Sequence, residues 1–354
     1  MASKKKSKKT SSDTPVSELR RDLVTGNWIV IARGRGNRPH VHKRIEEPDD
    51  PIETCPFEDP QASGNGEPIL AYPSISSGQA KDGDDWSLQV IPNKYPAFAT
   101  PDMPDGSRGE CGVITKVGPY SVQDGRGFHE VIITRDHSKH IPLLSEAKAK
   151  EIFMAYRERY LSFKDEECVK YVSIFHNHGR EAGASLTHPH SQLVAIPILP
   201  SDIKRSLSGS SVFYRKHGKC VHCAMLAFER EEKKRIVFEN KDFIAICPFV
   251  SRDAYEVRIF PQEHTAYFEK TSDKAIASLA EVFQYVLSRF YNKLDDPAYN
   301  FYLHTAPIGG DEFDQYHWHF EVRPKLETAA GFEFSTGVEI ATVEPEKAAE
   351  FLRT

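Results

Sequence analysis

The hydrophobic pattern of one stretch of the chain predicts five elements in a row. Residues 130–134 contain the apolar run 131–133, which is typical of a buried strand. Residues 145–163 carry apolar side chains at helical spacing, and Ser145 is a suitable N-cap. A strand at 171–175, a glycine-rich turn and an extended segment at 188–192 complete the order.

The same order of elements recurs later in the chain. The expected strand, helix, strand and final extended segment span 256–260, 273–294, 300–304 and 317–321. The separation of His137 from His188 nearly equals that of His264 from His317, so side chains as well as elements repeat. A duplication explains this better than chance, and it predicts an α+β fold of two tandem domains, each a mainly antiparallel sheet with packed helices.

A proline-flanked exit at 197–200 and a Ser/Gly stretch at 206–211 mark the junction between the two copies. We therefore predict a first, catalytic domain at 16–203 and a second domain at 204–354. Residues 1–15 contain the lysine run 4–9 and no apolar stretch, which predicts a disordered basic tail rather than a signal peptide. A nucleic-acid or membrane contact is the alternative for this tail.

Composition narrows the class of protein. The 354 residues are 39% hydrophobic and 27% charged, as in soluble globular proteins, and the net charge of −5 implies no large cationic surface for nucleic acid. No apolar run is long enough to span a bilayer. Six cysteines in so long a chain do not form a disulfide framework, so we expect a cytoplasmic protein whose paired cysteines bind metal.

The segment His188-Pro-His190-Ser-Gln192 carries the most specific chemistry. On an extended backbone, residues 188, 190 and 192 point to one side, so two imidazoles and one amide would converge. Gly179, Gly183 and Ser185 just upstream would let the backbone approach a phosphate closely. The combination predicts phosphoryl or nucleotidyl transfer with a histidine nucleophile. A polar strand with hydrogen-bonded histidines is the alternative.

The second copy has His317-x-His319-x-Glu321 but no counterpart of the glycine-rich stretch at 179–185. We therefore expect only the first copy to carry the nucleophile.

Two sets of side chains have the composition of zinc sites. In the second copy, two thiolates and two imidazoles would complete a tetrahedral structural site: Cys220, Cys223, His264 and His317. A redox-active or incidental Cys-x-x-Cys is the alternative. The first copy offers Cys55, Glu58, His137 and His188. A carboxylate replaces one thiolate there, which weakens the site and leaves its occupancy open, with a buried Cys55 and a surface Glu58 as the alternative.

These motifs together resemble the galactose-1-phosphate uridylyltransferase family of the histidine-triad superfamily. The resemblance runs from about residue 18 to 324, and more weakly over 331–337. Its strongest segments are 22–28, 35–39, 136–139 and 177–192. It implies that both copies are histidine-triad-like domains and that the protein is a homodimer.

The resemblance also implies roles for single residues. His190 would form a nucleotidyl-histidine, with Gln192 in place of the third histidine of the hydrolases. Arg35 and Arg38 would contact phosphates, and Asn93 would contact the nucleotide. Asn177, Gly183 and Ser185 would hold the α-phosphate and the histidine loop, while Cys55, His137 and His188 would bind zinc. A neutral amide at residue 192 is a poor general acid, which favours transfer between phosphates over hydrolysis.

Two departures from the family pattern leave the substrates open. Glu58 stands where many members have cysteine, and Ser191 stands where the best-known uridylyltransferases have glycine. The leading prediction is UDP-glucose–hexose-1-phosphate uridylyltransferase, acting by ping-pong kinetics on a nucleotide sugar and a sugar 1-phosphate. One alternative is ADP-glucose phosphorylase, since some relatives with serine at that position use phosphate as acceptor. Another is a non-catalytic, zinc-dependent protein that binds nucleotides or nucleic acid.

Overall fold

The structure is a computed structural model that describes residues 16–35, 48–73, 86–102, 107–308 and 312–354. The predicted basic tail, Arg38 and the two glycines at 309–310 lie outside the described residues. None of the helices in the described part of the chain combines the length and the apolar character needed to cross a membrane.

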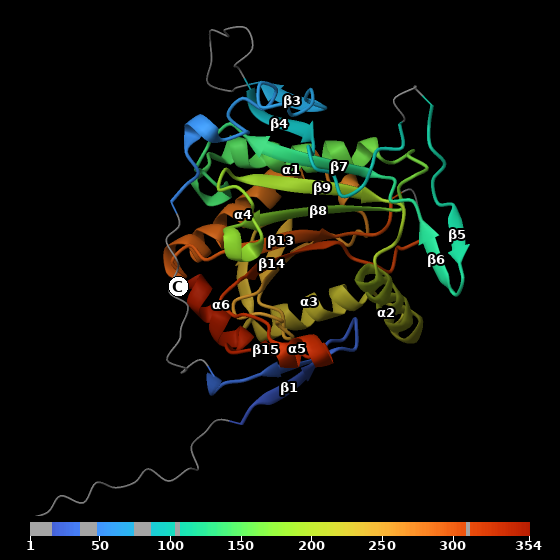
Figure 1. The fold of residues 1–354 in the computed structure, drawn as a ribbon. Helices are drawn as coiled ribbons and strands as arrows, with labels where there is room; N and C mark the ends of the chain where they lie inside the picture. The colour runs from blue at the N-terminus through green and yellow to red at the C-terminus, as the bar shows by residue number, and fades with distance from the viewer. Residues whose placement is uncertain (1–15, 36–47, 74–85, 103–106, 309–311) are drawn as a thin grey trace, which may run out of the picture.

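Within the described residues, ten strands form one sheet in the order β10-β11-β12-β14-β13-β8-β9-β7-β4-β3 (Figure 1). All its pairings are antiparallel. The strands are β3 (Leu70–Pro73), β4 (Trp86–Pro92), β7 (Phe128–Thr134), β8 (Tyr171–His178), β9 (His190–Ile196), β10 (Ile236–Glu239), β11 (Phe243–Ile246), β12 (Val257–Pro261), β13 (Tyr299–His304) and β14 (His319–Pro324). Outward from the central β8–β13 pair, β9, β7 and β4 on one side match β14, β12 and β11 on the other. The predicted α+β fold with repeated antiparallel halves is confirmed.

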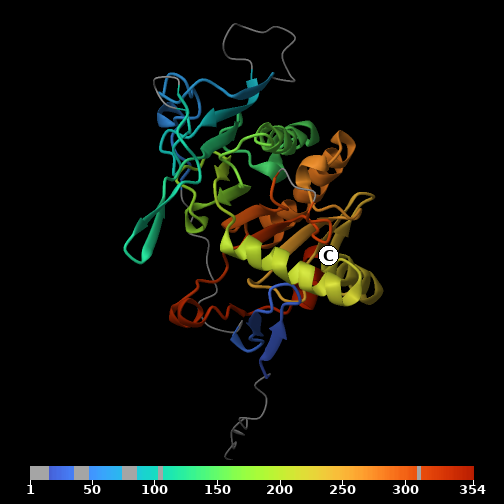
Figure 2. The ribbon, with the colours of Figure 1, turned by 90° about the vertical axis from the view of Figure 1, so that its right-hand side faces the viewer.

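Helices α1 (Glu146–Ser162) and α4 (Asp273–Lys293) cover one face of this sheet (Figure 2). Each begins at a serine cap, because Ser145 Oγ accepts from Lys148 N and Ser272 Oγ accepts from Ala275 N. Their buried apolar side chains pack against the strands in one large core. Both helices lie where the periodicity predicted them. The opposite face of the sheet, called the front face here, is turned toward the viewer in Figure 1.

The remaining helices lie mainly around the second copy. They are α2 (Ser201–His217), α3 (Val221–Glu232), α5 (Gly331–Thr336) and α6 (Pro345–Arg353), with short 3-10 turns at Ile52–Thr54, Ile141–Leu143, Arg180–Ala182 and Phe268–Lys270. A small sheet joins β1 (Glu18–Arg21) and β2 (Trp28–Ile31) to β15 (Ile340–Ala341) near the C-terminus. The domain boundary at 203/204 stays a prediction.

The hairpin of β5 (Ile114–Val117) and β6 (Tyr120–Gln123) projects from the body of the molecule (Figure 1). Beside it, Cys111 and Cys168 form a disulfide with their Cα atoms 5.2 Å apart, which the cysteine count did not predict. The other four cysteines are free.

The prediction of a strand over 188–192 was wrong at its start. β9 begins at His190, and His188 lies in the preceding turn. The second copy has the same arrangement, because β14 begins at His319, two residues after His317.

Candidate active site

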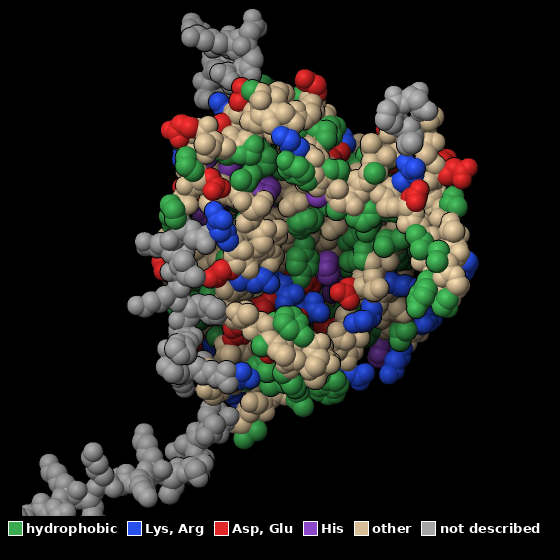
Figure 3. Space-filling view, viewed as in Figure 1, with side chains coloured by type: hydrophobic (Ala, Val, Ile, Leu, Met, Phe, Trp, Pro, Cys, Tyr) green, Lys and Arg blue, Asp and Glu red, His purple; other side chains and the backbone are tan. Residues whose placement is uncertain are grey.

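Alternation along β9 separates its side chains between the two faces of the sheet. Ser191 is buried on the helix side, where Tyr156 of α1 and His176 of β8 contact its Oγ atom. His190 and Gln192 therefore point to the front face. The front face is hollowed near the middle of the molecule, with histidine and basic side chains in the hollow (Figure 3).

The His190 ring has a fixed orientation. Its Nδ1 atom lies 2.9 Å from the carbonyl oxygen of His188, and since a carbonyl only accepts, Nδ1 carries the proton. Nε2 is left with its lone pair, and it has no hydrogen-bond partner among the described residues. Phe57 packs against the ring with the centroids 5.3 Å apart. Burial lowers the pKa of His190, which favours the neutral imidazole that a nucleophile requires.

Two glycines form the turn between β8 and β9. Gly179 and Gly183 have φ values of +78° and +89°, which residues other than glycine rarely adopt. A Cβ atom at Gly179 would also lie only 2.8 Å from the Cβ atom of Ala298. Gly183 and Ser185 are exposed on this turn. The backbone N–H of Gly183 donates to the Arg180 carbonyl at 2.9 Å, whereas that of Ser185 has no backbone acceptor among the described residues and is available to a phosphate.

Asn177, at the end of β8, is held by the second copy. Asn300 of β13 donates from Nδ2 to Asn177 Oδ1 at 2.7 Å and to the carbonyl oxygen of Ala182 at 2.8 Å. Sequence reasoning did not identify Asn300, because only the register of β13 on β8 places it opposite Asn177.

His129 of β7 joins two predicted residues. Its Nε2 atom lies 2.8 Å from Gln192 Oε1 and 3.0 Å from Asn93 Nδ2. Sequence reasoning missed this histidine as well, although a polar side chain at the start of an apolar strand is a usable signal.

Of the two predicted arginines, only Arg35 lies within the described residues. Arg35 follows β2 and lies near Glu327 and Glu333. The small sheet lies at the far end of the molecule from β4 (Figure 1). Arg38 is outside the described residues.

The predicted first-copy metal ligands do come together. The ligand atoms of Cys55, Glu58, His137 and His188 all lie within 4.8 Å of one another. Glu58 Oε1 is 2.8 Å from His137 Nδ1 and 3.4 Å from His188 Nδ1. His137 Nε2 lies 2.8 Å from the carbonyl oxygen of Asp50, and His188 Nε2 lies 2.8 Å from that of Thr134. Their Nδ1 atoms are thereby left for a metal, as in many zinc sites. Glu58 belongs to the cluster and is not a separate surface charge.

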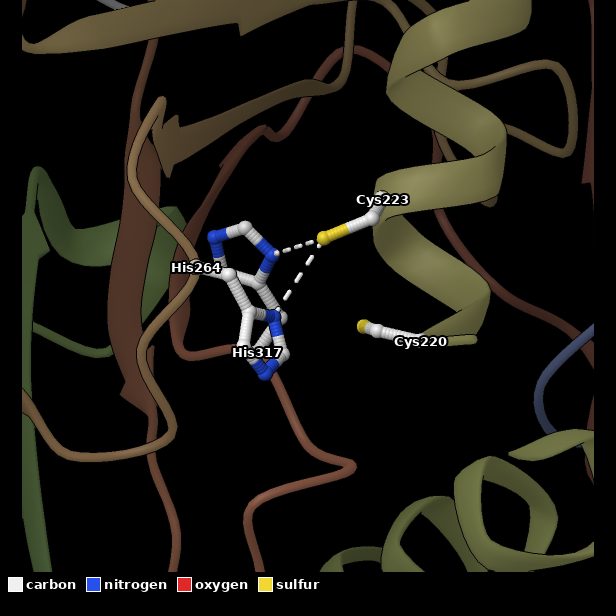
Figure 4. A group of neighbouring side chains, drawn as sticks. All are labelled: Cys220, Cys223, His264 and His317. Carbon is white, nitrogen blue, oxygen red and sulfur yellow. Dashed lines mark hydrogen bonds between the residues drawn. The ribbon is translucent and has the colours of Figure 1, made fainter. Parts of the chain in front are cut away.

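The second-copy ligands form a matching cluster (Figure 4). Cys223 Sγ is 3.3 Å from His264 Nδ1 and 3.5 Å from His317 Nδ1. Again the Nε2 atoms face carbonyls, those of Asp314 at 2.5 Å and Pro261 at 3.0 Å. Cys220 occupies the position before the first residue of α3, and a hydrogen bond from Cys223 lowers the pKa of the Cys220 thiol. The residues fit a four-coordinate zinc ion with two thiolates and two imidazoles.

The counterpart of the His190 site in the second copy has different chemistry. His319 Nδ1 lies 3.1 Å from the His317 carbonyl, as in the first copy, but Glu321 takes the place of Gln192. Although burial opposes ionisation, Arg258 at 3.2 Å and nearby histidines hold the pKa of Glu321 well below its usual value. A buried carboxylate at this position would repel a phosphate.

Comparisons with known proteins place these observations in context. A family model described as galactose-1-phosphate uridyl transferase, N-terminal domain, matches residues 7–200, and a domain of unknown function matches residues 125–353. The chain is 29% identical over 341 residues to the ADP-glucose phosphorylase of Arabidopsis thaliana, covering 95% of this chain and 92% of the relative. It is 28% identical over 346 residues to the galactose-1-phosphate uridylyltransferase of Thermotoga maritima, covering 95% and 98%.

The fold is similar to a solved structure of the Arabidopsis thaliana ADP-glucose phosphorylase with bound ADP-glucose. The TM-score is 0.77 and the identity 27%, over 96% of this chain and 99% of that one.

Proposed function

From the premise that this chain belongs to the galactose-1-phosphate uridyl transferase family, we propose that it transfers a nucleotidyl group between phosphates through a covalent intermediate on His190. The chain is an enzyme of nucleotidyl transfer. The covalent step is supported by the contact of His190 Nδ1 with the His188 carbonyl. This contact would keep the proton on Nδ1 and leave the lone pair of Nε2 available for attack on the front face.

In the first half-reaction, His190 Nε2 attacks the α-phosphorus of a nucleoside diphosphate hexose. The N–P bond forms as the P–O bond to the sugar 1-phosphate breaks, and the sugar 1-phosphate leaves with that electron pair. In the second, a phosphate oxygen of the acceptor attacks the same phosphorus and the N–P bond breaks. Ping-pong kinetics follow from this sequence. Asn177, Gln192 and the backbone N–H of Ser185 would stabilise charge on the α-phosphoryl oxygens, and Gly183 would give the turn its shape.

The first candidate reaction is uridylyl transfer from UDP-glucose to a hexose 1-phosphate such as galactose 1-phosphate. Gln192 supports transfer rather than hydrolysis, because an amide can hydrogen-bond a phosphoryl oxygen but supplies no proton to a poor leaving group. Asn93 would contact the nucleotide. We also propose that the protein is a cytoplasmic homodimer. Arg35 and Arg38 would contact phosphates.

A second candidate is ADP-glucose phosphorolysis, in which adenylyl passes to inorganic phosphate. The similarity to the Arabidopsis thaliana enzyme in sequence and fold favours it. Ser191 and the second Cys-x-x-Cys pair, which some such enzymes share, point the same way.

Both metal clusters are proposed as zinc sites. Cys220, Cys223, His264 and His317 would hold a structural ion that ties the start of α3 to the β14 side of the sheet. Cys55, Glu58, His137 and His188 would do the same beside the histidine loop. Bound zinc would supply rigidity, while the groups that react and bind phosphate are those of the chain itself.

Intact-mass spectrometry after separate incubation with UDP-glucose and ADP-glucose tests the proposal. We expect a uridylyl or adenylyl adduct on the wild-type protein and none on His190→Ala. His319→Ala is the matched control and should keep the adduct. An adduct that survives His190→Ala would contradict the assignment. Failure to label with either donor, together with salt-sensitive nucleic-acid binding, would favour the non-catalytic alternative instead.

A further inference from the structure

We propose that His129 and Asn300 are positioning residues that turn the side-chain amides of Gln192 and Asn177 so that both NH₂ groups face the reacting phosphate. This inference rests on the proposed function and adds residues that neither the motifs nor the metal clusters assign. It follows from hydrogen bonds whose direction is set by backbone groups, since a backbone N–H can only donate and a backbone carbonyl can only accept.

The direction at Gln192 is set by Ala97. The backbone N–H of Ala97 donates to His129 Nδ1 at 3.1 Å, so Nδ1 is bare and the proton of the neutral ring is on Nε2. Nε2 lies 2.8 Å from Gln192 Oε1 and donates to it. The amide nitrogen of Gln192 is therefore turned away from His129. It has no hydrogen-bond partner among the described residues, so its two hydrogens are available on the front face.

Asn93 does not reverse this assignment. Its Oδ1 atom accepts from the backbone N–H of Tyr95 at 2.8 Å, so the Nδ2 atom that lies 3.0 Å from His129 Nε2 is a donor too. The single Nε2 proton serves Gln192, and Asn93 Nδ2 is then a second donor 3.0 Å from Nε2, so its hydrogens must be directed past the ring to another acceptor.

The direction at Asn177 is set by Ala182. The Ala182 carbonyl accepts from Asn300 Nδ2 at 2.8 Å, which identifies that atom as the NH₂ group. The same Nδ2 donates to Asn177 Oδ1 at 2.7 Å, so the Asn177 oxygen is occupied, and its nitrogen has no hydrogen-bond partner among the described residues. Asn177 follows His176, which pairs with Ser191, so Asn177 lies across from His190 on the front face.

Two amide donors thus flank Nε2 of His190, one along β9 and one across on β8. Donors fixed before the substrate arrives stabilise developing negative charge without reorganisation during the reaction. The second copy serves as an internal comparison, because Glu321 and His304 stand in the places of Gln192 and Asn177. Neither is an amide, and the buried carboxylate accepts where the first copy donates.

The test is to change whether the side chain at residue 129 donates or accepts the hydrogen bond to Gln192. A glutamine side chain can donate to Gln192 Oε1 as His129 does, methionine leaves the amide undirected, and glutamate can only accept, which turns the Gln192 oxygen toward the phosphate. The measurement is the single-turnover rate of adduct formation on His190 with saturating UDP-glucose and ADP-glucose. We expect His129→Gln to keep most of the rate and His129→Glu to lose about 100-fold, as on removal of one oxyanion donor, with His129→Met between them.

Ionic strength separates orientation from simple charge repulsion. Repulsion by the carboxylate of the His129→Glu variant would be screened by salt, whereas an inverted amide would not. Recovery of His129→Glu to the His129→Met rate in about 0.5 M salt would overturn the proposal, as would equal rates for His129→Gln and His129→Glu.

The same comparison applies at residue 300. We expect the rate of adduct formation to fall in Asn300→Ala and to fall further in Asn300→Asp, because a carboxylate there can only accept. If the isosteric Asn300→Asp reacts as fast as Asn300→Ala, the role of Asn300 is contradicted.

A readout without turnover keeps this inference distinct from the proposed function. Long-range ¹⁵N–¹H NMR spectra report which ring nitrogen of His129 is protonated. If the wild-type protein forms no adduct, the proposed function fails, and an Nε2–H tautomer of His129 would still support the orientation. An Nδ1–H tautomer or a charged ring would overturn the orientation even if the adduct forms.

Discussion

Replacing Ser191 with the glycine that the best-known uridylyltransferases carry tests whether this residue selects the nucleotide. Its side chain is only 3% exposed and lies on the helix side of β9, away from His190. Tyr156 Oη and His176 Nδ1 both contact Ser191 Oγ, the latter at 3.0 Å. Burial lowers the pKa of His176 well below its usual value, so its ring is neutral at pH 7. We expect Ser191→Gly to change stability and not the choice between UDP-glucose and ADP-glucose.

The size of the effect follows from the groups that lose their partner. Without the hydroxyl, one buried phenol and one buried imidazole nitrogen are left unsatisfied, at about 1–3 kcal/mol each. A cavity of about 10 Å³ already lies beside Ser191 and His176, and the lost side chain would enlarge it enough for a water molecule to bridge them. The expected loss in the free energy of unfolding is therefore near the lower end, about 2–3 kcal/mol.

Urea denaturation measures this loss, and intact-mass labelling with a mixture of UDP-glucose and ADP-glucose measures the preference. Adding Tyr156→Phe removes one of the two orphaned groups, so the double variant should lose about 1 kcal/mol less than the sum of the single variants. Additive losses would contradict the hydrogen-bond account. A change of about tenfold in the adduct ratio at unchanged stability would refute the reasoning, because Ser191 would then act on the nucleotide.

Three further outcomes are expected. Cys223→Ser should release the zinc of the second cluster and lower the thermal midpoint, as measured by elemental analysis and calorimetry. The control variant Cys247→Ser, which changes a buried cysteine outside the cluster, should keep that zinc. Glu58→Cys should slow zinc loss from the first cluster to a chelator, and an equal effect of exposed Glu53→Cys would contradict a role for position 58. Gly183→Ala should cost about 1–2 kcal/mol in urea denaturation, because only its φ is unfavourable. Gly179→Ala should cost more, because its Cβ would also meet Ala298, and the reverse order would contradict this geometry.

Local patterns predicted the elements of both copies and the composition of both metal clusters. The helices at α1 and α4 follow from apolar spacing and serine caps, which depend on neighbouring residues only. Four ligands at repeated spacings were enough to group Cys220 with His317, because the duplication related them to the first copy.

The rest depends on pairings between distant segments. His129 and Asn300 acquire their contacts from the register of β7 on β9 and of β13 on β8. Arg35 lies where it does because β2 pairs with β15, at the opposite end of the chain. The start of β9 at His190 and the Cys111–Cys168 disulfide likewise follow from tertiary packing, on which hydrophobic periodicity gives no information.

The antiparallel pairing of β8 with β13 makes each half of the large sheet depend on the other. Cut from its neighbour, the first half would present the backbone groups of β8 as an open edge, which invites aggregation. It would also lose Asn300, and with it the hold on Asn177 and the glycine turn. Neither half can be removed without leaving the edge strand of the other unpaired.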